Sequence, residues 1–201
     1  MYLAKEVWVP HVWTFRPGIE MSNVSRSPRL DVSLLFCIYG EISRQNPMSV
    51  WNDQDRWTAL CSGAACPICS RREPLDVVAK LEVCWVTMQE AAPVPGYACL
   101  VSQIHAVELH DLPEAAAAGF MRDARRVSRA LAAATGAVKM NYEIHGNSLP
   151  HLHMHFFPRY RGDRFEGQPI NPKLVAQPVY APGEFHRVRD AFLSALDSAA
   201  A

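Results

Sequence analysis

The sequence predicts an α+β domain whose sheet is mainly antiparallel. Three observations carry this prediction: strand-like segments come first, one long amphipathic helix follows, and two further strands precede a C-terminal helix. Runs of strands separated by single helices are typical of α+β domains, whereas doubly wound folds alternate strand and helix regularly. The expected architecture is therefore an antiparallel sheet with one long helix between its strands and a helix at the C-terminus.

The strands are predicted from apolar segments that are bounded by turn residues. Three of them precede the long helix, and a Pro- and Gly-containing turn at 93–96 introduces the third; they cover residues 76–81, 83–88 and 96–103. Two more strands are expected over 137–144 and 150–157, the second ended by Pro158. Residues 159–182 contain four prolines and two glycines, which favours a loop.

The long helix is expected to begin after an N-cap at Asp111, with Pro113 and Glu114 in its first turn, and to end at Gly136. Apolar residues recur along it at spacings of three and four, which gives it one face to bury: Phe120, Ala124, Val127, Leu131 and Ala134. A last helix is expected from about residue 182, with three apolar residues facing inward: Val188, Phe192 and Leu196.

The chain of 201 residues is long enough for one domain with an extension. Residues 1–47 show no persistent helix or strand pattern, and we interpret them as an N-terminal extension of doubtful status. A family-specific arm that packs on the domain is the alternative. Met48 begins a segment that is typical of a native start, so the domain is expected to span residues 48–201.

Composition excludes some classes of protein. Lys plus Arg and Asp plus Glu both number 20, so the net charge is zero, and a protein that wraps nucleic acid by bulk electrostatics is disfavoured. The longest uncharged apolar run, 32–40, is far shorter than the roughly 20 residues that cross a membrane. The N-terminus lacks the pattern of a signal peptide. We therefore expect a cytoplasmic protein without a membrane partner.

Cys66 and Cys69 form a C-P-I-C motif. In a reducing compartment such a pair is more often metal-binding or redox-active than a structural disulfide. A thioredoxin-like redox motif requires a strand-to-helix setting, which the surrounding sequence does not show. Two unconnected thiols are the remaining alternative, and metal binding is favoured.

The segment 151–157 alternates histidine with apolar residues. Because side chains on a strand alternate between its faces, His151, His153 and His155 are expected on one face and the apolar residues on the core face. Packing does not explain three histidines in this pattern. They could all bind one metal ion, or some could act catalytically with a neutral imidazole as nucleophile. A glycine-containing polar turn before them and Arg159 after them favour a phosphate ligand.

The stretch N-Y-E-I-H-G-N-S-L-P-H-L-H-M-H-F-F-P-R-Y, residues 141–160, resembles the histidine triad (HIT) family, whose signature of three histidines alternating with apolar residues it fits completely. The segment 93–112 is similar to the upstream strand, histidine and helix start of that family. The C-P-I-C motif resembles that of the zinc-containing branch. The resemblance covers about residues 60–165 and implies a HIT-like α+β fold.

The resemblance also implies roles for the triad. His153 would attack the α-phosphorus of a nucleotide and form a transient nucleotidyl-histidine, and His155 would position the phosphate or the leaving group. Substrate-binding roles are expected for four residues: Asn141, Asn147, Ser148 and Arg159. Asn147 stands where many family members have Gln, and it keeps the amide on a shorter arm. For Asn141, a structural hydrogen bond at the strand end is the alternative.

In zinc-containing relatives the first triad histidine turns toward the metal. The resemblance therefore implies a Cys2His2 site of Cys66, Cys69, His105 and His151. A zinc ion with four protein ligands has no open position for water, so we expect a structural metal. His110 is the rival to His105 as a ligand. His145 and His186 are interpreted as surface residues.

The function expected from these observations is hydrolysis or transfer at the α-phosphate of a nucleotide conjugate. Dinucleoside polyphosphates and nucleoside phosphoramidates are favoured over nucleotide sugars. A nucleotide-binding scaffold with little turnover is one alternative, and a zinc-dependent hydrolase with all three triad histidines as ligands is another. A role in processing DNA ends, and any stable nucleic-acid partner, are disfavoured. A homodimer is expected only by analogy with the family.

Overall fold

The structure is a computed structural model that describes residues 49–198. The predicted extension 1–47 lies outside the described residues, so its status and the start of the domain stay predictions. The described part contains four α-helices, α1 (Gln54–Cys61), α2 (Pro67–Arg71), α3 (Glu114–Thr135) and α4 (Glu184–Ser198), and five strands, β1 (Val77–Lys80), β2 (Cys84–Thr87), β3 (Ala98–Ser102), β4 (Lys139–Ile144) and β5 (His153–Arg159).

The five strands form one sheet in the order β1-β2-β3-β5-β4, and every neighbouring pair is antiparallel. The α+β prediction is therefore confirmed, and each predicted strand is present within a few residues. β5 is enclosed by two partners, so His155 lies opposite Cys99 of β3 on one side and Glu143 of β4 on the other. This double pairing fixes the backbone that carries the second and third triad histidines.

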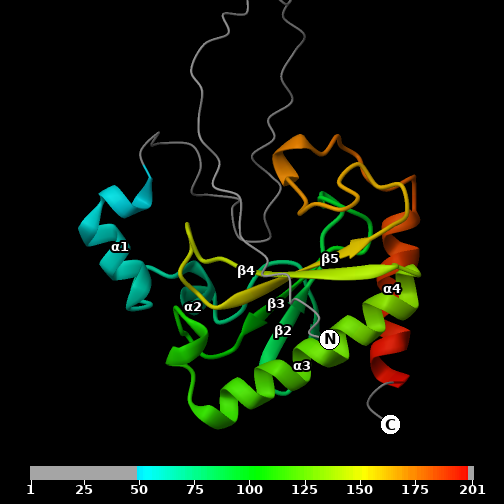
Figure 1. Ribbon diagram of the computed structural model, residues 1–201. Helices are drawn as coiled ribbons and strands as arrows, with labels where there is room; N and C mark the ends of the chain where they lie inside the picture. Colours follow the sequence, from blue (N-terminus) through cyan, green and yellow to red (C-terminus); the bar gives the residue numbers. More distant parts are fainter. Residues whose placement is uncertain (1–48, 199–201) are drawn as a thin grey trace, which may run out of the picture. The chain divides into compact units, whose positions relative to one another are not determined.

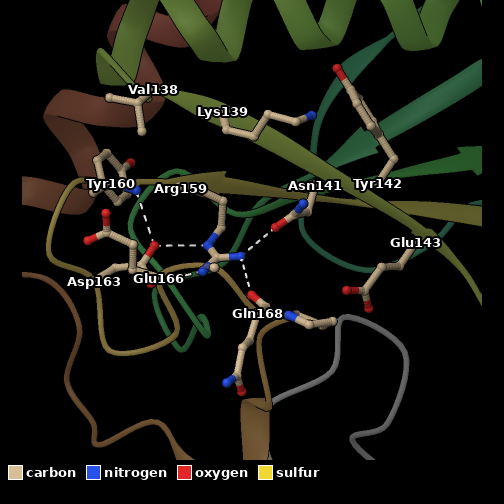
Figure 2. Close-up of a pocket in the computed structure, with 12 residues that line it drawn as sticks. Val138, Lys139, Asn141, Tyr142, Glu143, Arg159, Tyr160, Asp163, Glu166 and Gln168 are labelled. Atoms are coloured by element: carbon tan, nitrogen blue, oxygen red, sulfur yellow. Dashed lines mark hydrogen bonds and ion pairs between the residues drawn. The ribbon is translucent and has the colours of Figure 1, made fainter. Parts of the chain in front are cut away.

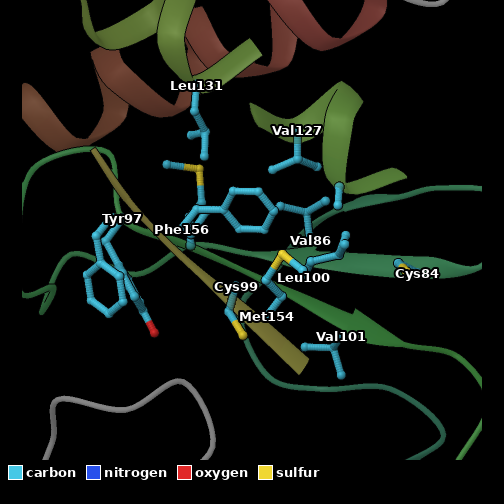
Figure 3. Close-up of a cluster of buried hydrophobic side chains, with 14 of the residues drawn as sticks. Cys84, Val86, Tyr97, Cys99, Leu100, Val101, Val127, Leu131, Met154 and Phe156 are labelled. Atoms are coloured by element: carbon cyan, nitrogen blue, oxygen red, sulfur yellow. The ribbon is translucent and has the colours of Figure 1, made fainter. Parts of the chain in front are cut away.

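The long helix α3 lies against one face of the sheet, and α4 packs on α3 (Figure 1). Its predicted apolar face is confirmed, because Phe120, Val127 and Leu131 are fully buried. The helix ends at Gly136, whose φ of 64° is the left-handed conformation that glycine adopts without a steric penalty. Figure 3 shows Val127 and Leu131 facing the sheet. None of the helices in residues 49–198 is both long enough and apolar enough to cross a membrane.

The two faces of the sheet differ in chemistry. Leu100, Met154 and Phe156 extend toward α3 and are buried there, while Tyr97 and Cys99 extend from the opposite face (Figure 3). His155 shares this opposite face, because it is the cross-strand partner of Cys99. The apolar half of the triad pattern thus anchors β5 in the core, and the histidine half is presented on the side away from α3.

Three predicted boundaries were wrong: the two ends of β5 and the start of α3. β5 begins at His153, not at residue 150, because the backbone N–H of His151 donates to Leu149 and that of Leu152 donates to Ala106. The strand continues through Pro158, which is tolerated because the ladder to β3 has already ended at Phe156.

The start of α3 also differs from the prediction. Its N-cap is Pro113, and the helix begins at Glu114. Asp111 instead ends a 3₁₀ helix, Leu109–Asp111, where its carboxylate accepts a hydrogen bond from the backbone N–H of Glu108 at 2.9 Å. Helices α1 and α2 were not predicted. Apart from Arg159, which ends β5, residues 159–182 form a loop, as expected, with one short 3₁₀ helix at Pro172–Leu174.

Candidate functional site

Four potential metal ligands come together from three distant parts of the chain. Cys66 is the N-cap of α2 and Cys69 lies within it, His105 follows β3, and His151 precedes β5. One ligand atom from each of them lies within 4.8 Å of all the others. The structure therefore brings together the four residues that the sequence predicted as ligands, and this set could hold a metal ion.

The distances between these atoms fit a tetrahedral ion. His105 Nδ1 and His151 Nδ1 are 3.2 Å apart, Cys69 Sγ lies 3.3 Å from His105 Nδ1, and Cys66 Sγ lies 3.4 Å from His151 Nδ1. Tetrahedral zinc with bonds of about 2.0–2.3 Å to nitrogen and sulfur separates its ligand atoms by roughly 3.3–3.8 Å. The donor set and these spacings are thus compatible with a zinc site.

Both histidines also turn an unprotonated ring nitrogen toward the place where the metal would lie. His105 Nε2 lies 2.9 Å from the carbonyl oxygen of Cys61, and His151 Nε2 lies 2.8 Å from that of Ser102. A carbonyl only accepts, so each Nε2 carries the proton and each Nδ1 turns a lone pair toward the cysteines. Burial lowers the pKa of His151 to about 4, which keeps this imidazole neutral as a metal ligand must be.

The alternatives for the cysteine pair and for His105 are disfavoured. Cys66 follows a turn after α1, so the strand-to-helix setting of a thioredoxin-like motif is absent from this part of the structure. His110, the rival ligand, is 83% exposed, lies 3.7 Å from the carboxylate of Asp111, and is not part of the cluster.

His153 lies on β5 with its ring held by the backbone. Its Nδ1 is 2.6 Å from the carbonyl oxygen of His151, so Nδ1 carries the proton and donates, and the neutral ring keeps a lone pair on Nε2. The side chain is buried, and burial lowers its pKa below the ordinary value. A neutral imidazole with an unprotonated Nε2 is the form that can act as a nucleophile.

His155 stands beside His153, with ring centroids 4.7 Å apart and the rings perpendicular. Burial, followed by the charges of His153 and His145, lowers the pKa of His155 to about 3. The hydroxyl of Tyr97 lies 2.6 Å from its Nδ1. Sequence reasoning missed Tyr97, although its position two residues before Cys99 places it on the histidine face of the sheet.

His145 also adjoins the triad. Its ring centroid is 5.7 Å from that of His155, and its Nε2 pairs with the Glu143 carboxylate at 2.9 Å. Half of its side chain is exposed, so it is a surface residue as expected, but one at the edge of the site. Asn147 and Ser148 lie in the connection between β4 and His151, next to Gly146, whose φ of 97° sets the turn.

The structure gives Arg159 a different place from the expected phosphate contact. It is buried, and its guanidinium forms a two-pronged ion pair with Asp163, with Nε–Oδ2 and Nη2–Oδ1 distances of 2.9 Å. The other N–H groups donate to the side-chain oxygen of Asn141 and the carbonyl of Gln168 (Figure 2), and to the carbonyl of Phe165. All five N–H groups of the guanidinium therefore have partners within the protein.

This network involves two residues that were expected to bind substrate. Asn141 makes the structural hydrogen bond that was its alternative interpretation, and Arg159 fastens the loop after β5 to β4, while the substrate contacts expected of both residues stay predictions. The network forms part of the wall of a cavity of about 550 Å³ at the β4 side of the sheet (Figure 2). The cavity reaches Glu143, the cross-strand partner of His155, so it adjoins the triad without containing it.

Replacing Arg159 by lysine is expected to lower the free energy of unfolding by about 2–3 kcal/mol, because lysine cannot reproduce the five donors of the buried guanidinium, which bind the partly buried Asp163 carboxylate and three other acceptors. Urea unfolding measures this. The matched control is Arg189→Lys, which alters the more exposed pair with Asp190 and should change stability by less than about 0.5 kcal/mol. Equal effects of the two substitutions would show that the Arg159 network is not structural.

Comparison with known proteins identifies the family and agrees with this fold. The HIT domain model matches residues 70–162. A histidine triad protein from Bradyrhizobium japonicum is 31% identical, with a TM-score of 0.53; the match covers 60% of this chain and 89% of that one. A Zn-bound histidine triad family protein from Mycobacterium smegmatis is 22% identical, with a TM-score of 0.52; the match covers 68% of this chain and 98% of that one.

A third structure, a histidine triad protein from Marinobacter aquaeolei, is 22% identical, with a TM-score of 0.53, and the match covers 61% of this chain and 88% of that one. No curated protein matches the sequence. The 31% match spans nearly the whole Bradyrhizobium protein, and the residues that the HIT domain model matches, 70–162, include the alternating histidines that the structure places on β5 and at its entry. The chain therefore belongs to the histidine triad (HIT) family.

Proposed function

We propose that the protein hydrolyses or transfers a nucleoside monophosphoryl group from a nucleotide conjugate, through a covalent intermediate on His153. Dinucleoside polyphosphates and nucleoside phosphoramidates are the favoured substrates. Membership of the HIT family supports the nucleotide as substrate class. The chemistry is supported by the arrangement of His153 and His155 on one strand.

The observation that carries the proposal is the hydrogen bond from His153 Nδ1 to the carbonyl oxygen of His151. It leaves the lone pair of Nε2 as the nucleophile for the α-phosphorus. As the new N–P bond forms and the bond to the leaving group breaks, the ring becomes cationic, and the same carbonyl stabilises that charge through the Nδ1 proton. Water or another acceptor then takes the nucleotidyl group and restores the neutral ring.

His155 is proposed to contact the phosphate or the leaving group, because its ring lies beside that of His153. Asn147 and Ser148 are proposed to bind the same phosphate from the turn that precedes His151. Arg159 is left out of the site, since its five N–H groups are engaged in the network with Asp163. Positioning and electrostatic stabilisation by these groups are what phosphoryl transfer requires from a protein.

A zinc ion bound by Cys66, Cys69, His105 and His151 is proposed as a structural cofactor. It would supply a rigid link between α2, the loop after β3 and the entry to β5. The cluster orients the residue whose carbonyl holds His153, so it supports the nucleophile without touching the substrate. Among the described residues the cluster does not include His153 or His155, which disfavours a catalytic zinc bound by all three triad histidines.

The test of this function is turnover against a panel of adenosine conjugates: a dinucleoside polyphosphate, a phosphoramidate and a nucleotide sugar. Binding of each compound is measured in parallel by calorimetry. Catalytic release of AMP from at least one compound, with the polyphosphate or phosphoramidate preferred over the sugar, is the expected result. Tight binding of nucleotides without turnover would contradict the enzymatic proposal and favour a nucleotide-binding scaffold.

A further inference from the structure

Glu143 and His145 form a hydrogen-bonded pair at the edge of the triad. His145 Nε2 lies 2.9 Å from the Glu143 carboxylate, and the centroid of its ring lies 5.7 Å from that of His155. Glu143 is the cross-strand partner of His155, so its side chain lies on the histidine face of the sheet. A carboxylate only accepts, so Nε2 carries the proton of the neutral ring and the lone pair is on Nδ1. The pair is thus a base that is oriented by an acidic partner.

The pair connects the triad with solvent and with the cavity at the β4 side of the sheet. Glu143 belongs to the wall of that cavity (Figure 2), and the side chains of His145 and Glu143 are 49% and 24% exposed. The rings of His153 and His155, by contrast, are buried. His145 is therefore the histidine of this group from which a proton passes to solvent most directly.

Hydrolysis of a nucleotidyl-histidine requires a base, because water is a weak nucleophile until it loses a proton. His153 cannot act as that base while its Nε2 is bonded to phosphorus. Burial, followed by the charges of His153 and His145, lowers the pKa of His155 to about 3, which makes its ring a weak base. His145 is the remaining imidazole beside these two rings in the part of the chain that the structure describes.

The geometry of phosphoryl transfer indicates where the base must lie. The attacking and leaving groups are roughly in line through phosphorus, so the water enters on the side that the leaving group vacates, opposite His153. A phosphorus on His153 Nε2, a water behind it and a base about 3 Å from the water span roughly 10 Å from ring to ring. His155 adjoins both rings, with centroid distances of 4.7 Å to His153 and 5.7 Å to His145, so the separation of the outer rings can match that span.

We propose that His145, held by Glu143, is the general base that activates the water attacking the nucleotidyl group on His153. This inference rests on the proposed function and adds the pair that resolves its intermediate. As the new O–P bond forms, His145 Nδ1 takes a proton from the water, and as the N–P bond breaks, its electron pair returns to His153 Nε2. The Glu143 carboxylate balances the charge of the protonated His145 ring, which then releases its proton to solvent.

The test measures formation and decay of the intermediate separately. The full-length protein, supplied with zinc, is mixed in excess with the best conjugate labelled at the α-phosphate and quenched in alkali at increasing times. The rise of protein-bound label gives the rate constant of formation, and its fall gives that of decay. Both constants are compared between the wild type and variants of the pair.

His145→Gln should lower the rate constant of decay by about 100-fold and change that of formation by less than about 3-fold, because the base acts only in the second step. Labelled protein should therefore accumulate. Glu143→Gln keeps an acceptor for His145 Nε2 but loses the negative charge, so decay should slow by about 10-fold. The control is His186→Gln, which replaces an exposed histidine on α4 and should form and resolve the intermediate as the wild type does.

Hydroxylamine distinguishes a lost base from a blocked site. It attacks phosphorus without first losing a proton, so it should accelerate decay in His145→Gln more than in the wild type. Wild-type decay in a folded His145→Gln protein, or slower formation with unchanged decay, would overturn the proposal. An intermediate in His145→Gln that hydroxylamine does not release would also overturn it, because access to phosphorus would then be blocked.

Failure of this role and failure of the proposed function give different results. If the wild type turns over no conjugate, the proposed function fails and the role of His145 fails with it. If the wild type forms and resolves the intermediate on His153 but His145→Gln resolves it equally fast, only the assignment of the base is wrong.

Discussion

Replacing His153 by alanine is expected to lower kcat/KM by at least about 10⁴-fold, because the reaction loses its nucleophile and the remaining groups only bind and orient the nucleotide. Nucleotide binding should survive within a few-fold. The measurement is steady-state release of AMP from the best conjugate, together with calorimetric titration of AMP. The loss should appear in kcat, since His153 is proposed to form its covalent bond only during the reaction.

The matched control for this loss is His186→Ala. His186 is an exposed histidine on α4, and its ring contacts only Phe185 among the aromatic contacts of the described residues. Its removal should leave activity unchanged. Thermal unfolding of both variants should stay close to that of the wild type if the folds are intact. A folded His153→Ala protein with wild-type turnover would contradict the assignment of the nucleophile.

Loss of the metal is expected to have the largest effect on stability. If free zinc stands about 1000-fold above its Kd, binding adds about 4 kcal/mol, and its loss lowers the Tm of a domain of this size by about 10 °C. Cys66→Ser and His105→Ala should both show this drop, with less than one zinc ion per chain by elemental analysis. Turnover should fall with it, because His151 carries the carbonyl that holds His153.

The control for the metal variants is Cys61→Ser. Cys61 offers its backbone carbonyl to His105, and its thiol is not part of the cluster, so zinc content and Tm should remain those of the wild type. Full zinc content in both Cys66→Ser and His105→Ala would contradict the proposed site. A zinc-free protein that keeps its Tm and loses all turnover would indicate a catalytic metal and not a structural one.

The part of the fold that could be predicted follows from periodicity. The face of α3 that carries Phe120, Val127 and Leu131 repeats every three or four residues, and β5 alternates every two, so each pattern reports burial directly. The short helices α1 and α2 give no such signal, because eight and five residues are too few to show an apolar face.

The metal cluster and the Arg159 network differ in how much of each the sequence indicates. Cys66, Cys69, His105 and His151 were found because ligand types and their family spacing survive in the sequence. Arg159 was assigned to phosphate because it follows the triad. Its partly buried partner Asp163 lies only four residues later, but no sequence pattern indicates that the loop turns back at that point. The sequence thus shows that a charged residue such as Arg159 lies near the triad, but the fold decides which residue it pairs with.

Tyr97 was missed for a related reason. It is 58 residues from His155 in the chain, and they meet only because β3 and β5 pair in one register, with Cys99 opposite His155. A tyrosine in an apolar strand is typical of a core residue, so its type gives no signal of function. The hydrogen bond to the triad becomes visible only when the strand order β1-β2-β3-β5-β4 is known.

The covalent intermediate on His153 can be tested directly by trapping it. The wild-type protein is mixed with a conjugate labelled at the α-phosphate, quenched in alkali within a single turnover, digested and mapped by mass spectrometry. The account predicts one acid-labile nucleotidyl group on the peptide containing residues 151–157, located at His153 and absent from His153→Ala. Label on another residue, or turnover without any labelled peptide at the earliest times, would contradict it.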